Sequence, residues 1–217
     1  MNRPTVLLAC VIALAWAGVP AGSLAADAGG ASGLGGAEAT NLAWMREEEK
    51  LAHDVYAGLA ARWPLPFLAR IQQSEARHFD AMGRMLQRYG QPDPARAAAG
   101  DFADPRLQSL YATLAEQGSR SEIDALRVGA LIEETDILDL QQAIAGTDEP
   151  VLLDVYRNLL DASHNHLRHF ADALAASGVV YEPQRMEPAQ YRQIVARPAA
   201  SGRGGRHHRQ CALGETT

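Results

Sequence analysis

The chain has 217 residues, a formal net charge of −6 and an aromatic content of only 6%. This length suits one domain, or one domain with tails. The acidic balance offers no electrostatic basis for binding nucleic acid, so we expect no nucleic-acid partner.

The N-terminal residues 1–25 have the features of a secretory signal peptide. Arg3 precedes an apolar run, residues 6–19, that is short for a membrane span, and Ser23 and Ala25 place small residues at the −3 and −1 positions. We expect cleavage near Ala25 and export to the periplasm or the medium, leaving no integral membrane domain. An uncleaved anchor is the alternative.

Composition divides the rest of the chain into three parts. Residues 26–40 are rich in glycine, alanine and serine and are predicted to be a flexible leader. Residues 41–196 carry the apolar periodicity of a folded domain. Residues 197–217 are rich in arginine, glycine and histidine, and we expect a disordered tail there.

Six helices are predicted in the folded domain, because apolar residues recur every three or four positions between breaks made by proline and glycine. No strand is needed. The predicted helices cover residues 41–63, 66–89, 105–117, 121–145, 148–177 and 188–196.

Polar residues mark where three of these helices begin. Thr40 or Asn41 can cap the first long helix, and Ser121 begins a sequence that resembles a capping box. Thr147 or Asp148 can cap the last long helix.

The lengths of the connections predict the topology. A tight turn joins the first two long helices, and another joins the last two, so each pair is expected to be antiparallel. The crossover between the pairs, residues 91–120, is long and carries a short helix. This all-α pattern predicts the ferritin-like form of the four-helix bundle.

Glu75 and His78 interrupt the apolar stripe of the second long helix. Their spacing places both side chains on the core face, one turn apart. A buried carboxylate costs several kcal/mol unless a partner compensates it. A divalent metal is such a partner, and di-metal carboxylate bundles use the Glu-x-x-His spacing.

The first long helix carries three consecutive glutamates, residues 47–49. Glu49 shares a face with Leu42 and Met45, whereas Glu48 shares one with Trp44. Periodicity cannot choose between Glu48 and Glu49 as the inward residue. A simpler interpretation is that the three acids complement the helix dipole near its N-terminus.

The third long helix directs two carboxylates inward. Glu133 and Asp136 share a stripe with small and apolar residues, whereas Glu134 and Asp139 are expected to be solvated. Two inward carboxylates repel each other, and one must take up a proton unless a cation lies between them.

The fourth long helix presents His166 on its apolar face. Carboxylates and imidazoles therefore recur at similar depth on all four long helices, which favours iron, with manganese or zinc as alternatives. The candidate metal ligands are Glu48, Glu49, Glu75, His78, Glu133, Asp136 and His166.

These residues lie in motifs that resemble known families. The segments 49–56, 75–78 and 133–136 resemble the Glu-x-x-Ala-x-x-x-Tyr, Glu-x-x-His and Glu-x-x-Glu motifs of rubrerythrin, with Asp136 in place of the last glutamate. About residues 42–195 resemble the ferritin-like family filed as domain of unknown function 2202. The resemblance implies a ferritin-like bundle that binds metal.

The fourth helix departs from the rubrerythrin pattern. Ala162, Asn165 and His166 stand where rubrerythrin supplies a glutamate and a Glu-His pair. With fewer carboxylates, we expect one ion, or two ions of unequal affinity.

The resemblance implies roles for the candidate residues. Glu75 and Glu133 would bridge or chelate, His78 and His166 would be terminal ligands, and Asp136 with Glu49 or Glu48 would complete the shell. Tyr56 is expected to be a core tyrosine with a satisfied hydroxyl; a second-shell or radical role is the alternative.

We expect an exported metal-binding protein, with oxidation of Fe(II) by dioxygen or peroxide as one alternative. That activity would make it a ferroxidase- or peroxidase-like oxidoreductase. The others are a non-enzymatic metal store, carrier or sensor, and a metal-free interaction module. A homo-oligomer is also left open.

Overall fold

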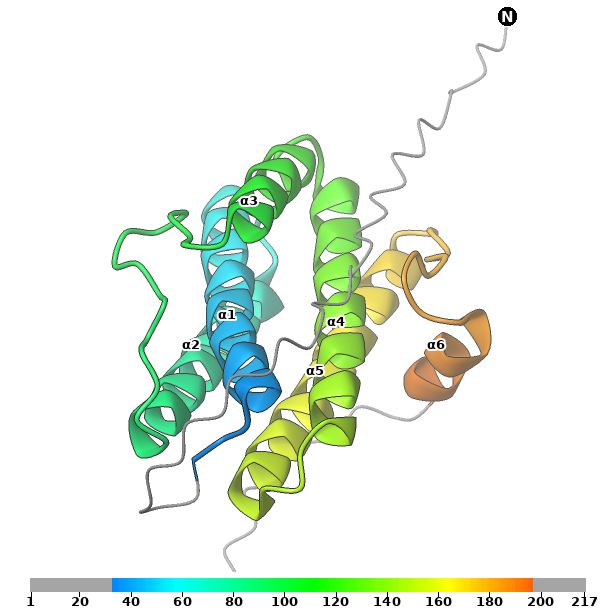
Figure 1. Cartoon of the computed structure of the whole chain (residues 1–217). Helices are drawn as coiled ribbons and strands as arrows, with labels where there is room; N and C mark the ends of the chain where they lie inside the picture. Colours follow the sequence, from blue (N-terminus) through cyan, green and yellow to red (C-terminus); the bar gives the residue numbers. More distant parts are fainter. Residues whose placement is uncertain (1–32, 197–217) are drawn as a thin grey trace, which may run out of the picture. The chain divides into compact units, whose positions relative to one another are not determined.

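The computed structural model describes residues 33–196, which form six helices and no strand (Figure 1). The signal peptide, most of the leader and the C-terminal tail predicted above lie outside these residues. The helices are α1 (Gly36–Arg62), α2 (Pro66–Arg88), α3 (Pro105–Gly118), α4 (Glu122–Ala145), α5 (Pro150–Ala176) and α6 (Pro188–Val195).

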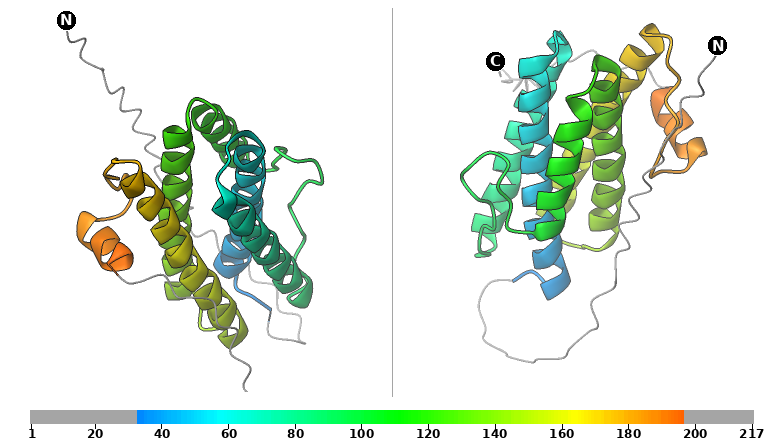
Figure 2. Two further views of the ribbon diagram at one scale, coloured as in Figure 1. Left: turned by 180° about the vertical axis from the view of Figure 1, so that it is seen from behind. Right: turned by 90° about the horizontal axis from the view of Figure 1, so that it is seen from above.

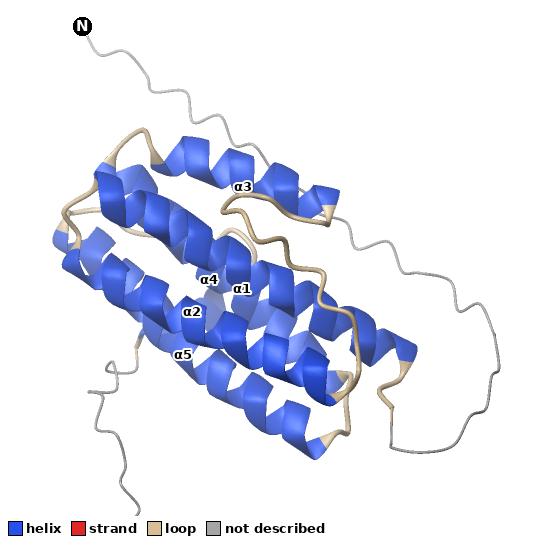
Figure 3. Cartoon of the chain, turned by 90° about the vertical axis from the view of Figure 1, so that its left-hand side faces the viewer, coloured by secondary structure: helices blue, strands red, loops and turns tan. Residues whose placement is uncertain are grey.

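The all-helical prediction is confirmed for this part of the chain. Helices α1 and α2 pack along each other, as do α4 and α5, and the two pairs meet through contacts of α1 with α4 and of α2 with α5. Helix α3 contacts α1 and α4, whereas α6 packs against α5 (Figures 2 and 3). In the described residues, no helix is long and apolar enough to cross a membrane.

Helix α1 begins at Gly36, which corrects the predicted start at Thr40 or Asn41 and the predicted extent of the leader. Glu38 explains the extra turn, because its carboxylate accepts the backbone N–H of Gly35 at 2.8 Å and the hydroxyl of Thr147. The Thr40 hydroxyl donates to the Gly36 carbonyl inside the helix. Thr40 is therefore not the cap.

The other predicted caps are partly correct. Ser121 caps α4, and its hydroxyl accepts the Asp124 N–H at 3.0 Å. The N-cap of α5 is Glu149 instead of Thr147 or Asp148. The Thr147 hydroxyl accepts the Glu149 N–H at 3.1 Å, so Thr147 shapes the turn before the helix.

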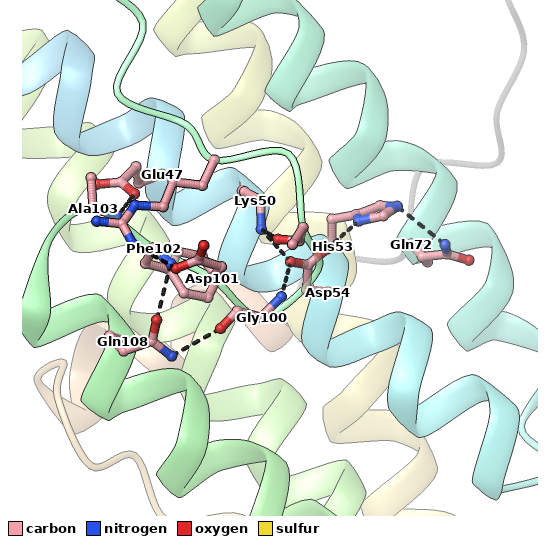
Figure 4. A network of polar contacts seen from close by, with 12 residues as sticks. Glu47, Lys50, His53, Asp54, Gln72, Gly100, Asp101, Phe102, Ala103 and Gln108 are labelled. Atoms are coloured by element: carbon pink, nitrogen blue, oxygen red, sulfur yellow. Dashed lines mark hydrogen bonds and ion pairs between the residues drawn. The ribbon is translucent and has the colours of Figure 1, made fainter.

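The crossover between α2 and α3 is pinned to α1 by buried charged groups (Figure 4). Glu47 accepts the backbone N–H groups of Ala103 and Asp104, at 2.6 and 3.0 Å. The buried pair Lys50–Asp54, at 2.6 Å, adds bonds to the Ala98 carbonyl and the Gly100 N–H. These bonds satisfy loop backbone groups that would otherwise be buried without partners.

Glu134 anchors the segment that follows α5. Its side chain is fully buried, which corrects the prediction that it is solvated. It accepts the Tyr181 hydroxyl and three consecutive backbone N–H groups, those of residues 184–186. A carboxylate with this many donors is compensated without a cation.

Gly129 allows α4 and α5 to approach closely. A Cβ atom at this position would lie 2.1 Å from Cε1 of Phe170, a ring that is fully buried. The same turn of α4 brings the Gly129 carbonyl within 3.3 Å of the Tyr56 hydroxyl. The close approach thus positions the helix turn that carries Glu133.

Replacing Gly129 with alanine should destabilise the fold. Overpacking a buried site typically costs about 1–3 kcal/mol, which a urea denaturation curve would measure. Gly58→Ala is the matched control, because Gly58 is an exposed helical glycine with no atom within 4 Å of an added Cβ. The control should be neutral or stabilising by up to about 1 kcal/mol. Equal effects in both variants would contradict the close-approach explanation.

Candidate metal centre

Glu75 of α2 lies between the two predicted histidine ligands. Its side chain is buried, with 2% exposure. Its Oε2 atom is 2.8 Å from Nδ1 of His78, one turn further along the same helix, and its Oε1 atom is 2.8 Å from Nδ1 of His166 on α5. One carboxylate therefore faces two imidazoles, one with each oxygen.

Glu49 and Glu133 complete the arrangement from α1 and α4. Glu49 Oε2 lies 3.4 Å from His78 Nδ1, and Glu133 Oε2 lies 3.5 Å from His166 Nδ1. Two groups of three potential ligands result, Glu49–Glu75–His78 and Glu75–Glu133–His166, each with its ligand atoms within 4.8 Å of one another. Glu75 belongs to both groups.

Several atoms of these groups lack a hydrogen-bond partner although they are buried. They include Glu49 Oε1, Glu75 Oε1 and His166 Nδ1. The last two are only 2.8 Å apart, but they are not aligned as a hydrogen bond. Unpartnered buried polar atoms are costly, and a cation coordinated by all of them would remove the cost. The donor set therefore fits a metal ion.

Other side chains hold the ligands in place. The Tyr56 hydroxyl is 2.5 Å from Glu133 Oε1, so it is satisfied as predicted. Tyr56 also stacks on Phe170 at 5.5 Å between ring centroids. Ser74 Oγ lies 3.4 Å from His78 Nε2, which leaves Nδ1 toward the carboxylates. Such outer contacts orient ligands and tune their basicity.

The buried carboxylates repel one another, and this affects their protonation. Burial raises the pKa of Glu49 to about 8, although His78 opposes the shift. Burial and the neighbouring acids also raise the pKa of Asp136 well above its ordinary value. Glu75 differs. Burial disfavours its charge, but His166 and His78 outweigh that effect and hold its pKa well below the usual range.

The histidines favour the charged form. Burial lowers the pKa of an imidazole, but for His78 the bonds and charges of Glu49 and Glu75 outweigh it and raise the pKa to about 11. His166 behaves similarly beside Glu133 and Glu75, with a pKa raised to about 10. Two protons thus neutralise part of the cluster, and a metal ion would have to displace them.

Glu48 and Asp136 lie beside the two groups but belong to neither. Asp136 accepts the hydroxyl of Ser163 from α5. Glu48 is as deeply buried as its neighbours in the chain and forms a hydrogen-bonding pair with Asp139. Periodicity left Glu48 and Glu49 as alternatives, and the structure places Glu49 with the histidines.

Asp139 was missed as part of this polar region. It is half-buried and accepts the indole N–H of Trp44 at 3.1 Å, which corrects the prediction that it is solvated. Its position one turn after Asp136 was the available signal. Consecutive glutamates at the α1 N-terminus are likewise no longer explained by the helix dipole, because α1 begins at Gly36, several turns earlier.

The two imidazoles lie at the more accessible side of the cluster. His78 and His166 are 8% and 7% exposed, whereas Glu49, Glu75 and Glu133 are 1–2% exposed. The two rings stack at 5.9 Å between centroids, across the seam between α2 and α5. Small molecules would therefore reach the cluster from this seam, and the carboxylates lie deeper.

The fold and this cluster define an all-helical protein with a buried carboxylate–histidine group that can bind a metal ion. The chain belongs to the family described as "Uncharacterized protein domain (DUF2202)", whose model matches residues 38–198.

A relative from Methanocaldococcus jannaschii, the uncharacterized protein MJ0754, is 42% identical over 166 residues, which cover 76% of this chain and 90% of the relative. The crystal structure of that hypothetical protein aligns with a TM-score of 0.75 and 39% identity, covering 80% of this chain and 99% of the other. Neither name states a function.

The raised pKa values predict how the metal-free protein responds to pH. Glu49, His78 and His166 have folded-state pKa values above their ordinary values of 4.5 and 6.5, so the stability they contribute is lost as pH rises through about 8, 11 and 10. The lowered pKa of Glu75 acts only below its ordinary value of 4.5. Chelator-treated protein should therefore unfold more easily as pH rises from about 5 to 10.

Chemical denaturation at several pH values measures this trend. Added metal should reverse the slope over the neutral range, because metal competes with protons for the same ligands and binds better as pH rises. A metal-free unfolding free energy that is constant or increasing over that range would contradict the proton assignment.

Proposed function

We propose that α1, α2, α4 and α5 form a ferritin-like four-helix bundle that holds iron, one ion in each of the two ligand groups. The observation that carries the proposal is the position of Glu75, whose two oxygens each face the Nδ1 atom of a different histidine. A carboxylate placed in this way is suited to bridge two ions. The long crossover and the membership of all four helices in the centre support the bundle assignment.

The donor chemistry supports iron over softer metals. The groups offer carboxylate oxygens and imidazole nitrogens, a combination that suits iron, manganese and zinc. When bound, iron would supply one-electron redox chemistry, with dioxygen or peroxide as the oxidant and further Fe(II) as the substrate. Manganese and zinc are the alternatives that elemental analysis decides.

The chain's own residues would bind the ions and restrict access to them. Glu75 would bridge, and Glu49 and Glu133 would each complete one group. His78 and His166 would be the terminal ligands, and their partial exposure leaves the α2–α5 seam as the approach for an oxidant. Tyr56 would fix the orientation of Glu133 through its 2.5 Å contact.

We also propose that this protein acts outside the cytoplasm. The support is the sequence of residues 1–25, with Arg3, an apolar run and small residues before Ala26. Those residues lie outside the part that the structure describes. N-terminal sequencing of the protein from an expressing cell would show Ala26 as the first residue after export.

Substitutions should separate the two groups. Glu75→Gln removes the shared charge and should abolish most metal binding, whereas His78→Ala and His166→Ala should each reduce the stoichiometry by about half. Elemental analysis of protein purified without a histidine tag measures the occupancy. Metal at about 100 times its Kd should also raise the unfolding free energy of the wild type by about 2.7 kcal/mol, and this increment should vanish in Glu75→Gln.

Glu134→Gln is the matched control, because Glu134 is a buried glutamate on α4 that faces the segment after α5. It should lower stability and leave the metal content unchanged. Normal metal content in Glu75→Gln, His78→Ala and His166→Ala would show that the wrong residues were assigned.

Aerobic oxidation of Fe(II) distinguishes an oxidoreductase from a store or carrier. Wild-type protein should form ferric iron faster than the buffer alone, followed by its ultraviolet absorbance, and Glu75→Gln should match the buffer. Tight binding without faster oxidation would instead indicate a metal store, carrier or sensor. A melting temperature insensitive to iron, manganese, zinc and chelator would indicate a metal-free interaction module.

A further inference from the structure

Three carboxylates remain beside the two ligand groups, on the side where α1 meets α4. Glu48 comes from α1, and Asp136 and Asp139 come from successive turns of α4. The charges of both aspartates act on Glu48, and the Glu48 and Asp139 carboxyl groups are hydrogen-bonding neighbours. The two histidines lie at the α2–α5 seam instead. This cluster is thus separate from the imidazoles.

Two oxygens of this cluster are buried and unpartnered. They are Oε2 of Glu48 and Oδ1 of Asp136, in side chains that are each only 6% exposed. The second oxygen of Asp136 accepts the Ser163 hydroxyl, and Asp139 accepts the Trp44 indole N–H at 3.1 Å. Donors therefore satisfy the outer edge of the cluster and leave its interior oxygens unsatisfied.

A shared proton explains only part of this arrangement. One proton between Glu48 and Asp139 would account for the contact between their carboxyl groups. It would leave Glu48 Oε2 and Asp136 Oδ1 without a donor, at a cost of about 1–3 kcal/mol for each buried group. A cation would satisfy both oxygens together and reduce the repulsion among the acids.

We propose that Glu48, Asp136 and Asp139 form a third cation position between α1 and α4. Its donors are carboxylate oxygens without an imidazole, so it would take a hard cation such as Mn²⁺, Fe²⁺ or Ca²⁺. The position stands on its own residues and does not depend on iron in the histidine groups. It uses two residues, Glu48 and Asp136, that the sequence pointed to and that the histidine groups leave out.

Trp44 makes this position observable. Its indole nitrogen is 3.1 Å from Asp139, and tryptophan can transfer excitation to a terbium ion at short range. Terbium is a hard cation that prefers oxygen ligands. Titrating Tb³⁺ into the full chain, after removal of other metals, should therefore give terbium emission that is excited through tryptophan.

Isosteric variants locate the ion. The double variant Glu48→Gln/Asp139→Asn should lose the sensitised emission, and Trp44→Phe should lose it while Tb³⁺ still binds by calorimetry. Glu75→Gln, which disrupts both histidine groups, should retain it. Circular dichroism checks that each variant folds, and Glu48→Gln alone replaces the double variant if that protein is unstable.

Two results would overturn the proposal. Emission that persists in the Glu48 variants would place terbium elsewhere, including on exposed surface acids. Emission that disappears in Glu75→Gln would place the ion in the histidine groups. Because Glu75→Gln is also the test of the iron proposal, loss of iron together with retained emission would support both positions as separate sites.

Discussion

The arrangement of the whole centre depends on one interaction, the sharing of Glu75 between His78 and His166. Each imidazole Nδ1 lies 2.8 Å from a different oxygen of this carboxylate. Because His78 is on the same helix and His166 is on α5, the interaction links the two helix pairs at their polar centre. Glu49 and Glu133 then approach from α1 and α4, one beside each histidine. Charge repulsion among the acids makes this arrangement dependent on protons or a cation.

Helix α1 shows how one face after another can be used in consecutive residues. Glu47 binds the crossover backbone, Glu48 pairs with Asp139 of α4, and Glu49 faces His78 of α2. All three are buried, because α2, α3, α4 and the crossover surround this helix. A carboxylate on such a helix can be compensated by backbone N–H groups, by another acid or by a metal. Burial by itself therefore does not identify a ligand.

Much of the centre could be predicted from helical periodicity. Spacing of three residues in Glu75–His78, and of inward positions around Glu133 and His166, placed these side chains on core faces, where the structure has them. Periodicity failed for Glu134 and Asp139, which were expected in solvent. Each is compensated by a group distant in sequence: the backbone after α5 for Glu134, and the Trp44 indole for Asp139. Local spacing carries no information about such partners.

The sequence by itself determined the helices, most of their ends and the presence of acids and imidazoles on inward faces, because these follow from local propensity and spacing. Only the tertiary structure decided that Glu49 joins the histidines while Glu48 turns to Asp139, and that Glu75 is the shared residue. The physical reason is that a helix surrounded by neighbours buries several faces at once. Which buried acid meets which partner then depends on how the helices are placed around it.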